Sequence, residues 1–310
     1  MRHIHIAYEN YRELSHMNAR AAADPAAFVE ECEAEYQAGI LHAAAVIAER
    51  MAVSRVVLLA GPSSSGKTTT SHRLTDALAS RGIGAHVISM DDYFLTMDRE
   101  DRSLDYDAPE RMDIPLLQRH IAALEAEETI LIPHFDFTTG IQTPAVRALS
   151  PRQDEVVIFE GIHALSDLFC EIGDPTGVYL SARMRVLRDG ALFMPPEWLR
   201  YVRRSVRDER FRNSSFLRTL GLWRNVRRAE LRHILPSKEN AHVQLDTSLA
   251  YEPCLFAPYA IAGLRALPEA ELAAQGLSGI VEALEAFAVI SPDYVPDASL
   301  LREFIGKTAP

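Results

Sequence analysis

The chain has 310 residues, of which 48% are hydrophobic and 24% are charged, a balance typical of a globular protein with a buried core. Its formal net charge of −11 argues against a protein that holds nucleic acid through the phosphate backbone. Its cysteines, Cys32, Cys170 and Cys254, form no metal-binding pattern, and no apolar run approaches the roughly 18 residues of a membrane span. We therefore expect a cytoplasmic protein without a disulfide framework, a membrane contact or a nucleic-acid partner.

Hydrophobic periodicity predicts alternating helices and strands along most of the chain. The N-terminal half is expected to hold helices at 24–51, 67–80 and 114–127 and strands at 53–60, 85–89, 129–132 and 155–159. Weaker strands are expected at 178–181 and 242–245, with an arginine-rich helical segment between them, and the chain reads as helical from 251 to about 289. Such alternation predicts an α/β fold in which helices cover both faces of a parallel sheet.

Residues 61–68 read Gly-Pro-Ser-Ser-Ser-Gly-Lys-Thr and fit the pattern G-x-x-x-x-G-K-[S/T]. Its glycines let successive N–H groups converge on a phosphate, and the helix that follows presents its positive end to the same anion. In this pattern Lys67 bridges the β- and γ-phosphates and the Thr68 hydroxyl ligates Mg²⁺. A chance match is expected in roughly 1% of chains this long. The position between a strand and a helix instead favours an ATP–Mg²⁺ site formed by Gly61, Ser63, Ser64, Ser65, Gly66, Lys67, Thr68 and Thr69.

Carboxylates follow two of the other predicted strands. Asp91 follows the strand at 85–89, where a carboxylate can accept the proton of an attacking hydroxyl. Glu160 follows the strand at 155–159, where an acid can hold the hydration shell of Mg²⁺. A helix cap or a surface turn would use the same residues, so neither position decides the function alone.

Six segments together resemble the uridine kinase and phosphoribulokinase family of P-loop kinases. They are GPSSSGKTT (61–69), SMDDYF (89–94), YDAPERMD (106–113), IPHFDFTTG (132–140), VVIFEGIHAL (156–165) and RRSVRDERFR (203–212). They occur in the family's order between about Val53 and Thr247. The resemblance implies an ATP-dependent kinase with a P-loop NTPase-type parallel sheet, helices on both faces, and helical N- and C-terminal extensions.

The same resemblance implies roles for individual residues. Asp91 takes the place of the catalytic base, and Lys67 acts with Arg204 and Arg207 on the transferred phosphoryl group. Arg212 joins these arginines on a lid over about 197–232 that closes over the phosphates. The substrate is expected to contact Asp107, Phe135 and Asp136, of which Asp107 falls where the ribose hydroxyls bind. For the arginine run, a solvated helix face is the simpler interpretation, so only two or three of its members need a function.

A longer bacterial branch of uridine-kinase-like proteins is the closer match. It shares LWRNVRR (222–228), ILP (234–236) and SLLREFIG (299–306) with this chain. Members of that branch often carry synthetase-like domains ahead of the kinase, for which the first fifty residues leave no room. We therefore expect a helical N-terminal extension at 1–50, a P-loop kinase domain at 51–290, and a tail at 291–310 packed on the kinase.

The acceptor is harder to name. Short uridine–cytidine kinases read the pyrimidine edge with a tyrosine and a histidine, and Phe135 and Gly140 stand at those positions here. The leading hypothesis is phosphoryl transfer from ATP to the hydroxyl of a nucleoside. The alternatives are a kinase of a sugar, polyol or other metabolite, and a nucleotide-gated regulator without turnover. Oligomeric state (a homo-oligomer included), regulation and the role of the N-terminal extension stay open.

Overall fold

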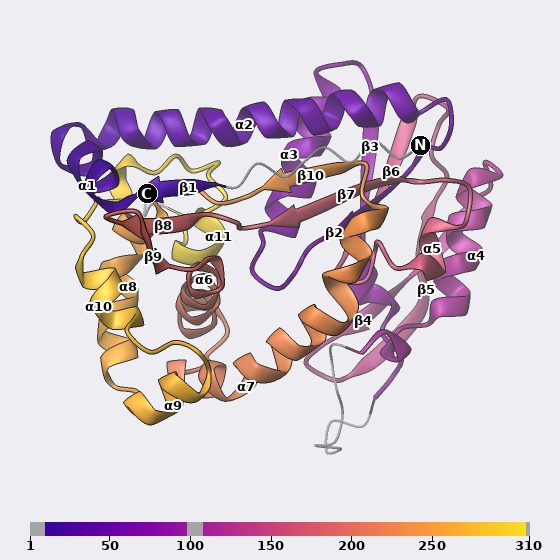
Figure 1. Cartoon of the computed structure of the whole chain (residues 1–310). Helices are drawn as coiled ribbons and strands as arrows, with labels where there is room; N and C mark the ends of the chain where they lie inside the picture. The colour runs from indigo at the N-terminus through magenta and orange to yellow at the C-terminus, as the bar shows by residue number, and fades with distance from the viewer. Residues whose placement is uncertain (1–9, 98–107, 308–310) are drawn as a thin grey trace.

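The computed structural model describes residues 10–97 and 108–307. Its centre is a five-stranded parallel sheet in the order β10-β7-β2-β6-β3 (Figure 1). The strands are β2 (Val56–Ala60), β3 (Gly84–Ser89), β6 (Glu155–Gly161), β7 (Thr176–Ser181) and β10 (Val243–Asp246). All of them were expected, β7 and β10 as weaker candidates. The apolar runs of β2 and β6 indicated strands buried on both faces, and every residue of these two strands is buried. The predicted α/β fold is confirmed.

Helices cover both faces of this sheet. One face packs against α2 (Pro25–Arg50) and α3 (Lys67–Ala79) through one large apolar cluster. The other face packs against α4 (Ile114–Glu125) and the short α5 (Asp167–Cys170) through a second cluster. The start of α2 is fixed by Asp24, whose side chain accepts a hydrogen bond of 3.0 Å from the N–H of Ala27.

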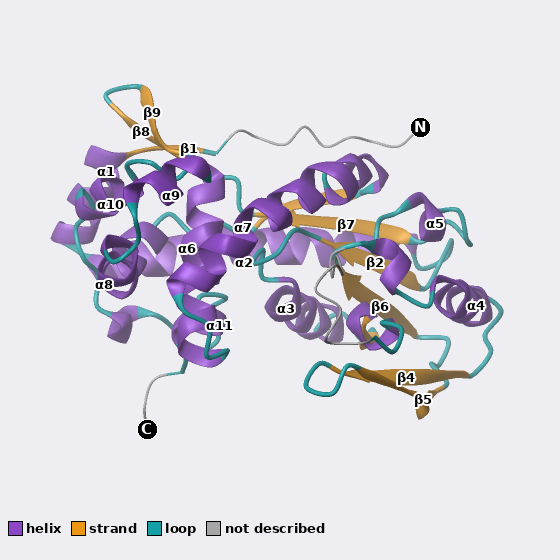
Figure 2. Ribbon diagram, turned by 90° about the horizontal axis from the view of Figure 1, so that it is seen from below, coloured by secondary structure: helices purple, strands orange, loops and turns teal. Residues whose placement is uncertain are grey.

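A second group of helices lies beside the sheet rather than on it (Figure 2). It contains α1 (Leu14–Ala23), α6 (Pro196–Phe211), α7 (Phe216–Ala229), α8 (Glu252–Arg265), α9 (Glu269–Ala274), α10 (Ile280–Glu285) and α11 (Arg302–Ile305). Single π- and 3₁₀-turns at Glu230–Ile234 and Pro236–Asn240 lead from α7 back to the sheet. Within the described ranges, none of the helices combines the length and the apolar character that a bilayer crossing needs.

A helix was expected in the segment between β7 and α6, and this expectation was wrong. The segment folds as a β-hairpin. β8 (Arg185–Arg188) and β9 (Ala191–Met194) are antiparallel, and β1 (Tyr11–Glu13) adds a third strand beside β8. The turn is Asp189-Gly190, and both residues have positive φ, 53° and 77°. An Asp-Gly pair is a strong hairpin signal because it adopts that geometry at low cost. This turn was overlooked because the arginine-rich segment around it was interpreted as a helix.

A second antiparallel ribbon, β4 (Ile130–Asp136) and β5 (Ile141–Leu149), lies apart from the parallel sheet (Figure 2). The sequence indicated the start of β4 and missed β5. Nearly all the side chains of β5 are exposed or half-buried, so its apolar residues show no alternation that would mark a strand.

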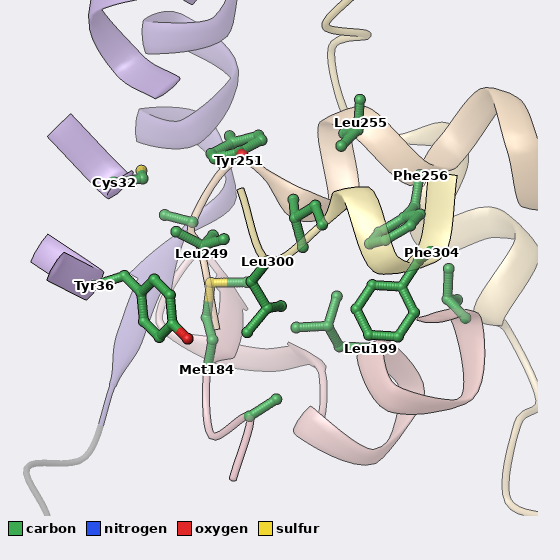
Figure 3. Packing of buried hydrophobic residues seen from close by; sticks show 14 of the residues in the cluster. Cys32, Tyr36, Met184, Leu199, Leu249, Tyr251, Leu255, Phe256, Leu300 and Phe304 are labelled. Atoms are coloured by element: carbon green, nitrogen blue, oxygen red, sulfur yellow. The ribbon is translucent and has the colours of Figure 1, made fainter. Parts of the chain in front are cut away.

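The C-terminal segment is part of the folded core. Leu300 and Phe304 are fully buried, and Figure 3 shows them among Leu199, Leu249 and Phe256. The Phe256 and Phe304 rings meet edge to face, with their centroids 6.1 Å apart. One apolar cluster thus draws on parts of the chain assigned to the N-terminal extension, the kinase domain and the tail. The three-part division of the chain stays a prediction.

We expect Phe304→Ala to lower the free energy of unfolding by about 3–5 kcal/mol, because truncating a buried ring leaves a cavity. Urea denaturation measures the change. Val289→Ala is the control: this side chain is 63% exposed, so its loss should change stability by less than about 0.5 kcal/mol. A Phe304→Ala protein as stable as the wild type would show that the C-terminal segment adds nothing to the core.

Candidate active site

The loop between β2 and α3 has the geometry of a phosphate cradle. Gly66 begins the helix with φ +79°, and a Cβ at this position would lie 2.3 Å from a methyl carbon of Leu300, so only glycine fits. The hydroxyls of Ser64 and Ser65 are buried and have no hydrogen-bond partner among the described residues. Lys67 donates to the carbonyl oxygen of Pro62 at 3.3 Å. Unpaired donors at the positive end of a helix fit a bound phosphate.

A cavity of about 270 Å³ brings most of the predicted site residues together. Its predicted members are Ser63, Ser64, Gly66, Lys67, Thr68, Asp91, Glu160, Arg204, Arg207 and Arg212. Four more residues, for which no role was expected, complete the wall: Phe94, Phe137, Ile162 and Glu303. The cavity therefore joins a phosphate cradle, two carboxylates and a group of arginines.

Asp91 and Glu160 reach the cavity from adjacent strands. Glu160 lies on β6 opposite Ser89 at the end of β3, and Asp91 follows in a 3₁₀ turn (Met90–Tyr93). Burial raises the pKa of Glu160, and the nearby Lys67 ammonium opposes that shift. Burial lowers the pKa of Lys67, and the carboxylates of Glu160 and Asp91 oppose it. An anion beside Lys67 would likewise favour its charged form.

Asp92 points away from this group. His134 Nδ1 lies 2.8 Å from Asp92 Oδ1, and the N–H of Phe135 donates to the same oxygen at 3.4 Å. The two neighbouring acids differ because the 3₁₀ turn directs successive side chains to different sides, and not because of strand alternation. Asp92 holds the β4 ribbon, whereas Asp91 lines the cavity.

Helix α6 is attached to the cradle by three arginines. The Arg204 side chain donates to Ser63 Oγ at 2.6 Å, and Arg200 Nε donates to the carbonyl oxygen of Ser63 at 3.2 Å. The fully buried Arg203 donates to the carbonyl oxygen of Ser64 at 3.1 Å. No role was expected for Arg200 or Arg203, because a helical arginine run does not show which of its members face inward.

Positive charge exceeds negative charge on the α6 side of the cavity. Arg204, Arg207 and Arg212 all lie near the Asp208 carboxylate, at 3.4, 3.5 and 3.6 Å. Burial and the adjacent Arg212 guanidinium lower the pKa of Arg207. One carboxylate does not neutralise three guanidiniums, so this side can accept further negative charge.

Glu303 on α11 supplies part of that charge. Thr69 Oγ1 donates to Glu303 Oε2 at 3.0 Å, and Arg207 lies 3.5 Å from the other carboxylate oxygen. The sequence gave a signal for this residue, since it falls in the SLLREFIG match at 299–306. Its role was missed because nothing in the pattern placed the C-terminus beside the P-loop.

Neither Phe135 nor Asp136, the predicted substrate residues that the structure describes, lines the cavity. Phe135 is buried behind the cavity wall and packs against Phe94 and Phe137 at 5.6 and 4.9 Å between ring centroids. Asp136 accepts hydrogen bonds from Thr138 and Thr139 in the turn after β4. Of the predicted cradle residues, Gly61 and Ser65 are in the loop without facing the cavity, and Thr69 bonds to Glu303. Asp107 lies outside the described residues.

Comparison with known proteins agrees with this geometry. Residues 56–248 match the model of the Phosphoribulokinase / Uridine kinase family. The chain belongs to this family. A uridine kinase from Ureaplasma urealyticum serovar 10 is 28% identical over 61% of this chain and 86% of its own length. A uridine kinase from Aeromonas hydrophila subsp. hydrophila is 31% identical over 61% of this chain and 84% of its own length. A solved structure described as a possible uridine kinase from Bacillus stearothermophilus is 18% identical, covering 62% of this chain and 88% of its own, with a TM-score of 0.41.

Membership makes this kinase a phosphotransferase that acts on a hydroxyl acceptor. The predicted fold and family are thereby confirmed. The family implies ATP as the phosphoryl donor and typically Mg²⁺. The unpaired hydroxyls, the Gly66 turn and the arginines of the cavity fit a triphosphate.

We expect Glu303→Gln to tighten ATP binding by about 1 kcal/mol, or roughly fivefold in Kd, because a carboxylate beside Thr69 repels the triphosphate. Calorimetry of Mg–ATP binding measures the change. Glu282→Gln makes the same change in net charge on a side chain that is 77% exposed, and should leave Kd unaltered. Weaker binding by Glu303→Gln would instead mean that the carboxylate assists the bound nucleotide.

Proposed function

We propose that this kinase transfers the γ-phosphoryl group of ATP to a hydroxyl of a nucleoside. The proposal is carried by one arrangement: Lys67, Asp91 and the α6 arginines face a single cavity. The N–H groups of the 61–66 loop and Lys67 would hold the phosphates. Thr68 and Glu160 would hold Mg²⁺, which when bound offsets charge on the phosphate oxygens.

Asp91 is the proposed base. Its carboxylate takes the proton of the acceptor hydroxyl as that oxygen bonds to the γ-phosphorus, and the bond between this phosphorus and the β–γ bridging oxygen breaks, releasing ADP. Arg204, Arg207 and Arg212 stabilise the charge that spreads over the phosphoryl oxygens. Because these guanidiniums are fixed to Ser63 and Asp208 before substrates arrive, little reorganisation is needed.

Two substitutions separate the donor and base roles. Lys67→Ala should abolish turnover and weaken ATP binding without unfolding the protein. Asp91→Asn should lower kcat by roughly 10²–10⁴ with ATP affinity nearly unchanged. Steady-state ADP release and calorimetry give both quantities. Asp92→Asn is the matched control, since Asp92 bonds to His134 outside the cavity. If Asp92→Asn lowered kcat strongly and Asp91→Asn lowered it only slightly, Asp92 and not Asp91 would be the base.

The nucleoside acceptor has two supports. The curated relatives are named uridine kinases, and the acceptor side of the cavity is walled by the aromatic rings of Phe94 and Phe137. Phe137 is 56% exposed, so its ring is available to stack on a base. An aromatic face does not distinguish bases by hydrogen bonds, which favours weak selectivity. A sugar or polyol acceptor is the second candidate, because Phe135 and Gly140 provide no polar readers.

We expect wild-type enzyme to phosphorylate uridine and other nucleosides with kcat/KM values within about 100-fold of one another, since apolar contacts discriminate by only about 1–3 kcal/mol. Phe137→Leu should lower kcat/KM for nucleosides by about 5- to 100-fold, the value of one stacked base. Ribose serves as the control acceptor and should not change. Equal losses for uridine and ribose would argue against stacking, and a wild-type preference for ribose or a polyol would favour the second candidate.

A further inference from the structure

A second cavity, of about 440 Å³, lies beside the N-terminal half of α6, whereas the P-loop cavity lies beside the C-terminal half of this helix. Its walls come from the end of β7, the start of α6 and the end of α7, which can be followed in Figure 1. Neither Lys67 nor Asp91 lines it. Five cationic side chains face two carboxylates there: Arg183, Arg185, Arg200, Arg227 and Lys238 against Glu197 and Glu230.

Two of the five cations share one carboxylate. Glu230 accepts hydrogen bonds from Arg200 at 2.5 and 2.9 Å and from Arg227 at 2.6 Å. These bonds occupy both oxygens of Glu230, and the two guanidiniums hold the pKa of that buried carboxyl below its usual range against the opposing effect of burial. Glu230 therefore cannot also balance the rest of the cavity.

Arg183 and Lys238 form no ion pair with a carboxylate among the described residues. The Arg183 side chain donates to Ser181 Oγ at 2.7 Å and to Gln244 Oε1 at 3.0 Å, both of them neutral acceptors. Asp246 lies near enough to favour the charged guanidinium, but its Oδ1 accepts from the backbone N–H of Arg183. Burial lowers the pKa of Lys238, and the positive charge of Arg183 lowers it further. Two like charges held together in a partly dry cavity destabilise the free protein unless an anion joins them.

We propose that this cavity binds a phosphate monoester. The Arg183 fork and the Lys238 ammonium suit a phosphate group, since a forked donor and a point charge together satisfy several of its oxygens. A water molecule fills about 30 Å³, so the cavity has room for a phosphate and an attached body. Tyr179, Leu231 and Leu235 provide the less polar wall for that body.

Such a ligand is an effector and not a second acceptor, because the proposed catalytic residues face the other cavity. Arg200 lines the second cavity and contacts Ser63, which lines the first. Its guanidinium is held by Glu230 on one side and donates to the carbonyl oxygen of Ser63 on the other. A bound phosphate that draws on these cations therefore acts directly on the residue that supports the loop.

Lysine scarcity makes a direct test available, because the chain has lysine only at positions 67, 238 and 307. Each can be followed separately by mass spectrometry after limited acylation with an amine-reactive ester. Saturating Mg–ADP is present throughout to occupy the cradle around Lys67. With inorganic phosphate or ribose 5-phosphate as the probe, the acylation rate of Lys238 should fall about tenfold, as a rise of about one unit in its pKa would produce. The exposed Lys307 should not change.

Two variants make the assignment specific. Arg183→Gln should remove the protection of Lys238 by either probe while Lys238 stays reactive. Lys238→Met should abolish calorimetric binding of ribose 5-phosphate in Mg–ADP, and Lys307→Met should retain it. All three are first shown to keep the wild-type thermal midpoint. Unchanged labelling of Lys238 at saturating phosphate, or protection that persists in Arg183→Gln, would overturn the proposal. Because the readout needs no turnover, it does not depend on the proposed reaction.

Discussion

Arg203 is fully buried, and its guanidinium joins three parts of the chain that are far apart in sequence. It donates to Glu252 at the start of α8 at 2.7 Å, to the carbonyl oxygen of Thr247 at 2.6 Å, and to the carbonyl oxygen of Ser64 in the phosphate loop. Breaking such a buried pair costs about 3–5 kcal/mol because one charge is left uncompensated, although the pair itself adds little net stability. Its effect here is to hold α6, α8 and the phosphate loop in one fixed arrangement.

That relation sets the electrostatics along α6. With Arg203 held inward, Arg204 and Arg207 face the phosphate cavity, and Arg200 reaches both Ser63 and the second cavity. Asp208, Glu303 and Glu230 offset part of this positive charge without matching it. A single helix thereby exposes excess cations to two separate spaces, and in each the proposed anion would supply the negative charge that the protein alone leaves incomplete.

The parallel sheet, the cradle and the placement of Asp91 beside Lys67 were predictable from the sequence, because each follows from local patterns at strand ends. Long-range placement was not. Glu303 meets Thr69 across 234 residues, and no local pattern encodes that contact. The β8–β9 hairpin was missed because its arginines suggested a helix, although the Asp189-Gly190 turn was present. Which arginines of α6 face inward is decided by their contacts with Glu252 and with the carbonyl oxygens of the phosphate loop. The spacing of the arginines alone does not reveal these contacts.

Turn chemistry also explains why the acceptor could not be assigned from the family pattern. Gly140 has φ +74°, where a histidine would be strained, and its carbonyl oxygen accepts from the N–H of Met97 at 3.0 Å. Asp136 is committed to the Thr138 and Thr139 turn, and Phe135 is buried beneath Phe137. Phe135 and Asp136 thus build the ribbon instead of lining the cavity, and Gly140 has no side chain to offer. What remains at the cavity is the aromatic surface of Phe94 and Phe137. For the nucleoside acceptor proposed above, such a surface would stack on a base without identifying it, in keeping with the weak selectivity expected.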